Sequence, residues 1–167
     1  MELFDAIATR SSAGRLTEPG PSPAEIERLI QAAQRAPDHG RMRPWRFTVL
    51  SGSDRDAFAA AAALAKRVRL PAMTDEQLGA EREKVLRSPV LIVVGCVVGA
   101  TAKVPEIEQI IAVGAAVENL FLAAHDLGYG VMWKTGAAAY DPAVKSVAGL
   151  AVHDHIVAIL HLGTRLK

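Results

Sequence analysis

A single long, apolar helix is the feature that most constrains how this chain folds. Between Val104 and Leu127, apolar residues occupy most of the circumference of the expected helix: Ile107, Ile110, Ile111, Gly114, Val117, Leu120, Leu122, Ala124 and Leu127. At 1.5 Å per residue this helix would be about 36 Å long. Because a helix that is apolar nearly all round must be covered on nearly every side, we expect other elements to pack around it.

The remaining patterns predict short helices and strands along the whole chain. Ser22-Pro23-Ala24-Glu25 combines an N-cap serine, a proline at the first helical position and a capping-box glutamate. The residues of Leu91–Val98 are apolar on both faces of an extended chain, which is typical of a central strand. Further helices are predicted at 2–9, after 53–56, after 74–77 and from 141, and further strands at 45–49, 131–133 and 156–162.

Composition limits the class of protein. The chain has 167 residues, 50% of them hydrophobic, so residues 1–167 are predicted to form one domain with a sizeable core. A formal net charge of +1 argues against a nucleic-acid partner, and one cysteine excludes a disulfide framework. No secretory leader is visible, and the longest apolar run, Pro89–Gly99, is too short to span a bilayer. We therefore expect a soluble, cytoplasmic protein without a membrane partner.

Several common kinds of active site find no support in the sequence. The chain contains no Gly-x-Ser-x-Gly, Gly-x-x-x-x-Gly-Lys or His-Glu-x-x-His motif. Gly128 and Gly130 follow a helix, which favours a helix C-cap over a dinucleotide fingerprint. Cys96 lies within an apolar run and is expected to be structural. His153 and His155 share one side of an extended chain and could bind metal, but turn residues before a strand are the favoured interpretation.

Three loops carry residues that suit an anionic ligand. Arg10, Ser11, Ser12 and Arg15 follow a helix end, where they either bind a phosphate or simply complement the helix dipole. A second loop, 38–43, holds two arginines, a histidine and an aspartate between prolines. The third, Trp133-Lys134-Thr135-Gly136, sets a charge and a hydroxyl at a strand end beside small residues.

Together these segments resemble the nitroreductase family of FMN-dependent oxidoreductases over essentially the whole chain. The resemblance rests on the order and spacing of four anchors: Arg10-Ser11-Ser12-Ala13-Gly14-Arg15-Leu16, Arg35-Ala36-Pro37-Asp38-His39 with Pro44-Trp45-Arg46-Phe47, Lys103-Val104-Pro105, and Gly130-Val131-Met132-Trp133-Lys134-Thr135-Gly136. It implies an α+β fold with a central mixed, mainly antiparallel sheet flanked by helices. It also implies an interlocked homodimer with two FMN sites at the subunit interface.

The resemblance assigns roles residue by residue. Cofactor-binding positions are Arg10, Ser11, Ser12, Arg35, His39, Trp133, Lys134 and Thr135, with Arg10 and Ser12 facing the phosphate. In similar proteins the end of the long helix contacts the nicotinamide nucleotide, which here corresponds to Ala123, Ala124, His125, Asp126, Leu127 and Gly128. No catalytic side chain and no metal is expected, since the flavin carries the chemistry.

The chain departs from the family pattern in its loops. Most relatives carry a second arginine where Ser11 stands and a glutamine where Arg43 stands, and many have asparagine or serine at the position of Arg41. Arg15 comes three residues after Ser12, whereas the usual basic residue comes two after it. Arg41 and Arg43 therefore either replace the lost phosphate donor or recognise an anionic substrate.

The resemblance implies a ping-pong cycle in which NADH or NADPH reduces FMN and a nitroaromatic compound, quinone or other small electron-poor acceptor is reduced in turn. A flavin or enone reductase on the same scaffold is one alternative, and a flavin-binding dimer without turnover is another. A homodimer also explains the long helix, because part of its apolar surface would then lie in the subunit interface.

Overall fold

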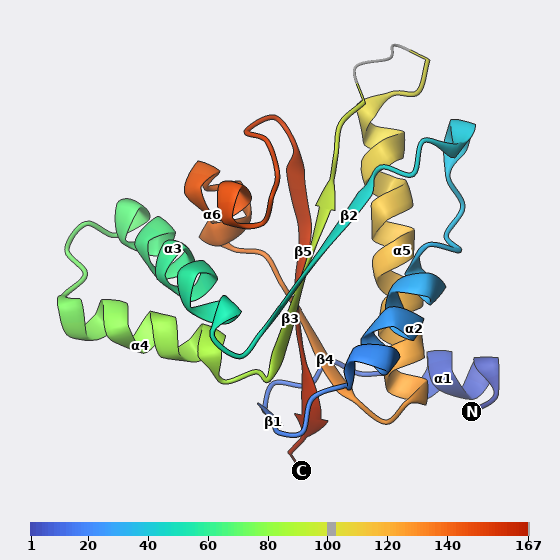
Figure 1. Cartoon of the computed structure of the whole chain (residues 1–167), viewed down its shortest axis with the longest axis horizontal. Helices are drawn as coiled ribbons and strands as arrows, with labels where there is room; N and C mark the ends of the chain where they lie inside the picture. The colour runs from blue at the N-terminus through green and yellow to red at the C-terminus, as the bar shows by residue number, and fades with distance from the viewer. Residues whose placement is uncertain (100–102, 167) are drawn as a thin grey trace.

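A five-stranded sheet with helices on both sides forms the centre of the molecule (Figure 1). The structure is a computed structural model that describes residues 1–99 and 103–166. The strands are β1 (Leu16–Thr17), β2 (Trp45–Ser51), β3 (Val90–Cys96), β4 (Gly130–Lys134) and β5 (His155–Arg165). β3 pairs with β2 and β5, and β5 also pairs with β4 and β1. All of these pairings are antiparallel, so the predicted α+β class with a mainly antiparallel sheet is confirmed.

The helices divide between the two faces of the sheet. They are α1 (Leu3–Thr9), α2 (Pro23–Ala33), α3 (Asp54–Arg69), α4 (Asp75–Leu86), α5 (Glu106–Asp126) and α6 (Pro142–Val147), with short 3-10 turns η1 (His39–Arg41) and η2 (Ala137–Tyr140). α2 and α5 cover one face, and α3, α4 and α6 lie on the other (Figure 1). Both capping boxes form, at Ser22–Glu25 for α2 and at Thr74–Gln77 for α4. Ser53 makes no capping hydrogen bond at the start of α3.

β3 is the central strand, and each of its residues is buried. Ile92 and Val94 pack into the core beneath α2 and α5. Leu91 and Val93 point to the other face and pack against α3, α6 and η2. The predicted strand buried on both sides is therefore confirmed, and it separates two cores.

α5 is buried along one side only. Val113, Val117 and Leu120 are fully buried, whereas Ile107 and Ile111 are 60% and 63% exposed. The expectation that the helix is covered on nearly every side is therefore wrong within the described chain. By length and composition alone α5 could cross a membrane, but 44% of its most apolar window is buried, and core helices pass the same test.

Candidate functional site

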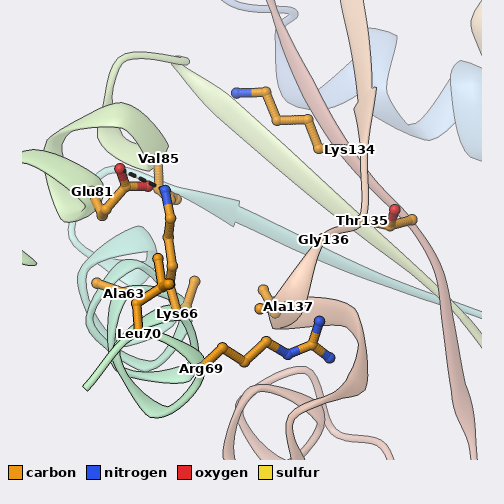
Figure 2. A pocket seen from close by; sticks show the side chains of 12 residues that line it. Ala63, Lys66, Arg69, Leu70, Glu81, Val85, Lys134, Thr135, Gly136 and Ala137 are labelled. Carbon is orange, nitrogen blue, oxygen red and sulfur yellow. Dashed lines mark ion pairs between the residues drawn. The ribbon is translucent and has the colours of Figure 1, made fainter. Parts of the chain in front are cut away.

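A cavity lies between α3, α4 and the segment that follows β4 (Figure 2). We call it the large cavity. Its volume is about 650 Å³, within the usual range for small-molecule sites. It is lined by Ala62, Ala63, Lys66, Arg69, Leu70, Glu81, Val85, Lys134, Thr135, Gly136, Ala137 and Ala138.

The local sequence explains why this space stays open. The alanine run of α3 favours helix formation but provides only methyl groups, so Ala62 and Ala63 form a wall without filling the cavity. On the opposite wall Gly136 has φ 63° and ψ −156°, a backbone conformation that is essentially restricted to glycine. This turn leads from β4 into η2 and leaves the backbone of Thr135 and Gly136 without a large side chain beside the cavity.

Charged side chains of the large cavity are only partly paired. Glu81 accepts hydrogen bonds from Lys66 at 2.8 Å and from Lys84 at 2.6 Å. These two ammonium groups hold the pKa of the Glu81 carboxyl below its ordinary value. Arg69 belongs to α3, as Lys66 does, but its side chain extends along the opposite wall towards Ala137 (Figure 2). Its guanidinium carbon lies 5.7 Å from the centre of the Tyr140 ring.

A second cavity of about 430 Å³ shares Lys134 with the first, and we call it the cationic cavity. Its lining includes four basic residues and no carboxylate: Arg15, Lys84, Arg87 and Lys134. Burial lowers the pKa of the Lys134 ammonium, and the positive charges of Arg87 and Lys84 lower it further. Such a concentration of positive charge suits an anionic ligand.

A buried histidine forms part of the lining of the cationic cavity. His161 of β5 is 3% exposed, and its Nδ1 lies 2.7 Å from the Ser88 hydroxyl. Burial lowers the pKa of His161 to about 3, and the charge of Lys134 acts in the same direction. The imidazole is therefore neutral at physiological pH. No sequence pattern indicated His161, because it stands as one polar residue within an apolar run.

The predicted phosphate loop runs alongside β4. The Ala13 amide donates to the Val131 carbonyl at 2.8 Å, which fixes the loop beside the strand that carries Lys134. Arg10 lies over the Phe121 ring at 4.9 Å, with its Nε 3.6 Å from Glu118. Ser12 is exposed.

The structure adds Arg165 to this loop. Its guanidinium donates to the Ser11 hydroxyl at 2.9 Å and to the Ser11 carbonyl at 2.6 Å. No sequence motif pointed to Arg165. Its position depends on the pairing of β1 with β5, which sets Leu16 opposite Arg165, and a two-residue strand has no recognisable pattern.

Two predicted residues lie on the other face of the sheet, beside α5. Arg35 lines a small cavity of about 290 Å³ together with Arg43 and Trp45. His39 of η1 has its Nδ1 2.5 Å from a carboxylate oxygen of Glu108. Neither Arg35 nor His39 is among the described residues that line the large cavity or the cationic cavity, so one chain does not bring them to Lys134.

Trp133, Lys134 and Thr135 lie together at the end of β4, as predicted for a strand end. Trp133 is 39% exposed, and its ring nitrogen donates to the Val157 carbonyl at 3.1 Å. Thr135 lines the large cavity, and Lys134 lines both cavities.

The end of α5 contacts α1 instead of either cavity. His125 lies 2.9 Å from the Thr9 hydroxyl, and Asp126 pairs with the amino terminus at 2.6 Å. Gly128 ends the helix with φ 86°, which confirms the predicted C-cap. Among the described residues that line the two cavities, none belongs to the segment 123–128 that was predicted to contact the nicotinamide nucleotide.

The remaining sequence candidates have structural contacts. Cys96 is fully buried, and burial raises the pKa of its thiol to about 11, as expected for an unreactive cysteine. His155 contacts Glu106 at 2.6 Å, and His153 lies 3.6 Å from Asp154. Arg41 and Arg43 both have positive φ, which is uncommon outside glycine. The Arg43 amide donates to Asp38 at 2.5 Å, which stabilises this tight loop.

Known proteins resemble the chain over its whole length. YdjA of Escherichia coli strain K12, named for NAD(P)H nitroreductase activity, is 34% identical over 164 residues, covering 98% of this chain and 88% of YdjA. A Haemophilus influenzae protein named in the same way is 30% identical over 173 residues, covering 100% of this chain and 90% of its own.

Solved structures share the fold. A nitroreductase-like family protein from Bacillus cereus superimposes with a TM-score of 0.85 at 25% identity, over 100% of this chain and 87% of that one. A Desulfovibrio desulfuricans protein solved in complex with FMN gives a TM-score of 0.77 at 23% identity, over 100% and 88%. The model of the nitroreductase family matches residues 7–164. The chain therefore belongs to the nitroreductase family.

Proposed function

We propose that this protein is an FMN-dependent NAD(P)H oxidoreductase that reduces nitroaromatic compounds, quinones or similar electron-poor acceptors in a ping-pong cycle. The observation that carries the proposal is the cationic cavity, where four basic residues and no carboxylate lie beside the loop of Arg10–Ser12. FMN is a dianionic phosphate monoester with a flat ring, so its charge and shape fit these residues. The names of the relatives support the same activity.

The donors of the loop fit the phosphate of FMN. Guanidinium groups and hydroxyls form charge-assisted hydrogen bonds to phosphate oxygens. Arg165 already donates to Ser11, so the two residues are held together before any ligand binds. We assign Arg10, Ser11, Ser12 and Arg165 to the phosphate.

FMN, when bound, supplies the hydride transfer from NADH or NADPH and onward to the acceptor. The chain supplies fixed positive charge: Lys134, Arg15 and Lys84 would stabilise the negative charge that the cofactor gains on reduction. Because these groups are held in place, their stabilisation requires little reorganisation. Because the cofactor transfers the hydride and the chain supplies the charge, no side-chain nucleophile is needed. The segment 123–128 stays our proposed contact for the nicotinamide nucleotide.

A homodimer would complete the site. Within the described part of one chain, Arg35 and His39 line neither cavity that contains Lys134, and a second copy can bring them to it. The apolar surface for such an interface is present: Leu3, Phe4 and Ile7 of α1 are 63%, 83% and 54% exposed, and Ile107 and Ile111 of α5 are equally open. Exposed apolar side chains of this kind, on α1 and near the start of α5, are typical of an interaction surface. We place the dimer in the cytoplasm, where its single thiol stays reduced.

Flavin uptake and turnover test the function. Purified protein should be yellow or should bind added FMN, and it should oxidise NADH or NADPH only when a nitroaromatic compound or quinone is present. Arg165→Ala should weaken FMN binding at least tenfold, because a charged hydrogen bond contributes about 1.5–3 kcal/mol. Arg82→Ala is the matched control, since Arg82 pairs with Asp56 on exposed surface. Protein that binds no FMN refutes the proposal, and FMN-loaded protein without acceptor-dependent turnover is a binding protein.

Sedimentation tests the dimer. Phe4→Glu places a charge in the apolar surface of α1 and should shift the protein to a monomer that binds FMN poorly. Glu2→Gln, at an exposed position just before the same helix, should leave the dimer intact. A wild-type protein that sediments as a flavin-loaded monomer contradicts the two-subunit site.

A further inference from the structure

The large cavity has more room than the cationic cavity and a different chemistry. Its walls are mostly apolar, with Ala63, Leu70 and Val85 on the helical side and Ala137 on the other. A flat aromatic ring can lie between such walls and against the bare backbone of Gly136. Because Lys134 lines both cavities, a ligand in the large cavity is adjacent to the proposed flavin site.

Two positive charges of this cavity, those of Arg69 and Lys134, make no ion pair among the described residues, and of these two only Arg69 lies outside the cationic cavity. Glu81 is already shared between Lys66 and Lys84. Arg69 makes no ion pair within residues 1–99 and 103–166, and its guanidinium lies over the Tyr140 ring. Basic residues at the end of a helix often serve only the helix dipole, but Arg69 is directed along the cavity wall towards Ala137 (Figure 2).

We propose that the large cavity is the acceptor subsite and that Arg69 selects aromatic acceptors carrying a carboxylate. The inference rests on the proposed function, since it names the substrate class of that same site. In the reaction, an aryl nitro group takes two electrons from one NAD(P)H with two protons, one of them from solvent. One N–O bond breaks, the oxygen leaves as water, and the products are the nitroso compound and NAD(P)⁺.

Paired acceptors test the selectivity. We would measure kcat/KM of the FMN-loaded enzyme for 4-nitrobenzoate and for neutral 4-nitrobenzamide, which has nearly the same shape. Arg69→Gln should lower kcat/KM for 4-nitrobenzoate about tenfold or more and leave the amide within about twofold. Arg67→Gln is the matched control, because Arg67 stands two residues earlier and pairs with Asp75 outside the cavity.

Benzoate provides a readout that does not depend on turnover. It has the carboxylate but no reducible group, so calorimetric titration of the FMN-loaded protein should show binding that Arg69→Gln weakens about tenfold and Arg67→Gln leaves unchanged. A protein that reduces no acceptor would refute the proposed function. Benzoate binding would still show whether Arg69 recognises an aromatic carboxylate in the large cavity.

Two results would overturn the inference. If Arg69→Gln lowers kcat/KM equally for both acceptors, Arg69 shapes the cavity and does not recognise the carboxylate. A loss seen with NADPH but not with NADH, whatever the acceptor, would assign Arg69 to the 2′-phosphate of the hydride donor.

Discussion

The two faces of the sheet are built differently. Beneath α2 and α5 the sheet is packed with branched and aromatic side chains, among them Leu29, Val117, Leu120 and Leu160. Across the sheet, α3 contributes mainly alanines and α4 has no buried residue. The large cavity is lined by both of these helices, and the cationic cavity is lined by the end of α4, β4 and the segment 13–16. One face therefore provides most of the packing, and the other keeps space and charge available for ligands.

The largest effect is expected in the packed face. Leu120→Ala removes a fully buried side chain from α5 and should lower the free energy of unfolding by about 3 kcal/mol. Leu64→Ala on α3 removes a side chain that is 53% exposed and should cost within about 0.5 kcal/mol. Urea unfolding at one protein concentration compares the two. Similar losses would show that the α3 face is packed as tightly as the α5 face.

His161, the buried histidine on the face that carries the two cavities, should make the free energy of unfolding depend on pH. His161 stays neutral in the fold down to a pKa of about 3, whereas the unfolded chain protonates it near 6.5. The unfolded state therefore binds more protons between these values, and stability falls as pH is lowered through this window. From pH 6 to pH 4 the loss from this group should be about 2.5 kcal/mol.

Comparison of variants isolates this contribution. His161→Gln should remove that part of the pH dependence, measured as the free energy of urea unfolding at several pH values. His153→Gln is the control, because the His153 side chain is 73% exposed. An unchanged pH profile in His161→Gln would mean that the imidazole is not held neutral by burial.

Removal of a helix N-cap should cause local unfolding on one face of the sheet and not on the other. Thr74→Ala at α4 and Ser22→Ala at α2 each remove a capping hydrogen bond, at a cost of about 1 kcal/mol. Because α4 buries no residue whereas α2 buries Leu29 and Ala33, the amides of α4 should exchange with deuterium by local opening. If Thr74→Ala speeds amide exchange in α4 alone, α4 opens locally as expected. If Ser22→Ala speeds exchange in α2 alone to the same extent, the two faces do not differ in local stability.

The smallest stability change is expected at the residue shared by the two cavities. Lys134→Gln removes a positive charge beside those of Arg87 and Lys84, so the free energy of unfolding should change by less than about 0.5 kcal/mol. FMN binding, measured by fluorescence quenching, should weaken severalfold, because fixed positive charge is lost. A strongly destabilised variant would show that Lys134 supports the fold and not the ligand.

Local patterns were sufficient for most elements and for part of the site. The capping boxes, the apolar strand Val90–Cys96 and the C-cap at Gly128 follow from residues close in sequence, because backbone hydrogen bonding and burial act locally. Motif spacing led to the loop of Arg10–Ser12 and to Trp133–Thr135, and the family assignment was confirmed. How these residues contribute to binding stays a prediction.

Tertiary structure decided which distant residues meet. Strand pairing places Arg165 on Ser11, and the packing of α3 against α4 joins Lys66 to Glu81. Arg35 and His39 belong to another anchor of the same family resemblance, and they line neither of the two cavities among the described residues. The sequence by itself determined the six helices, the longer strands and the family, since these depend on local periodicity and motif order. The cavities, the neutral His161 and the lack of an ion pair for Arg69 within residues 1–99 and 103–166 depend on side chains brought together from different elements, and only the folded chain specifies those distances.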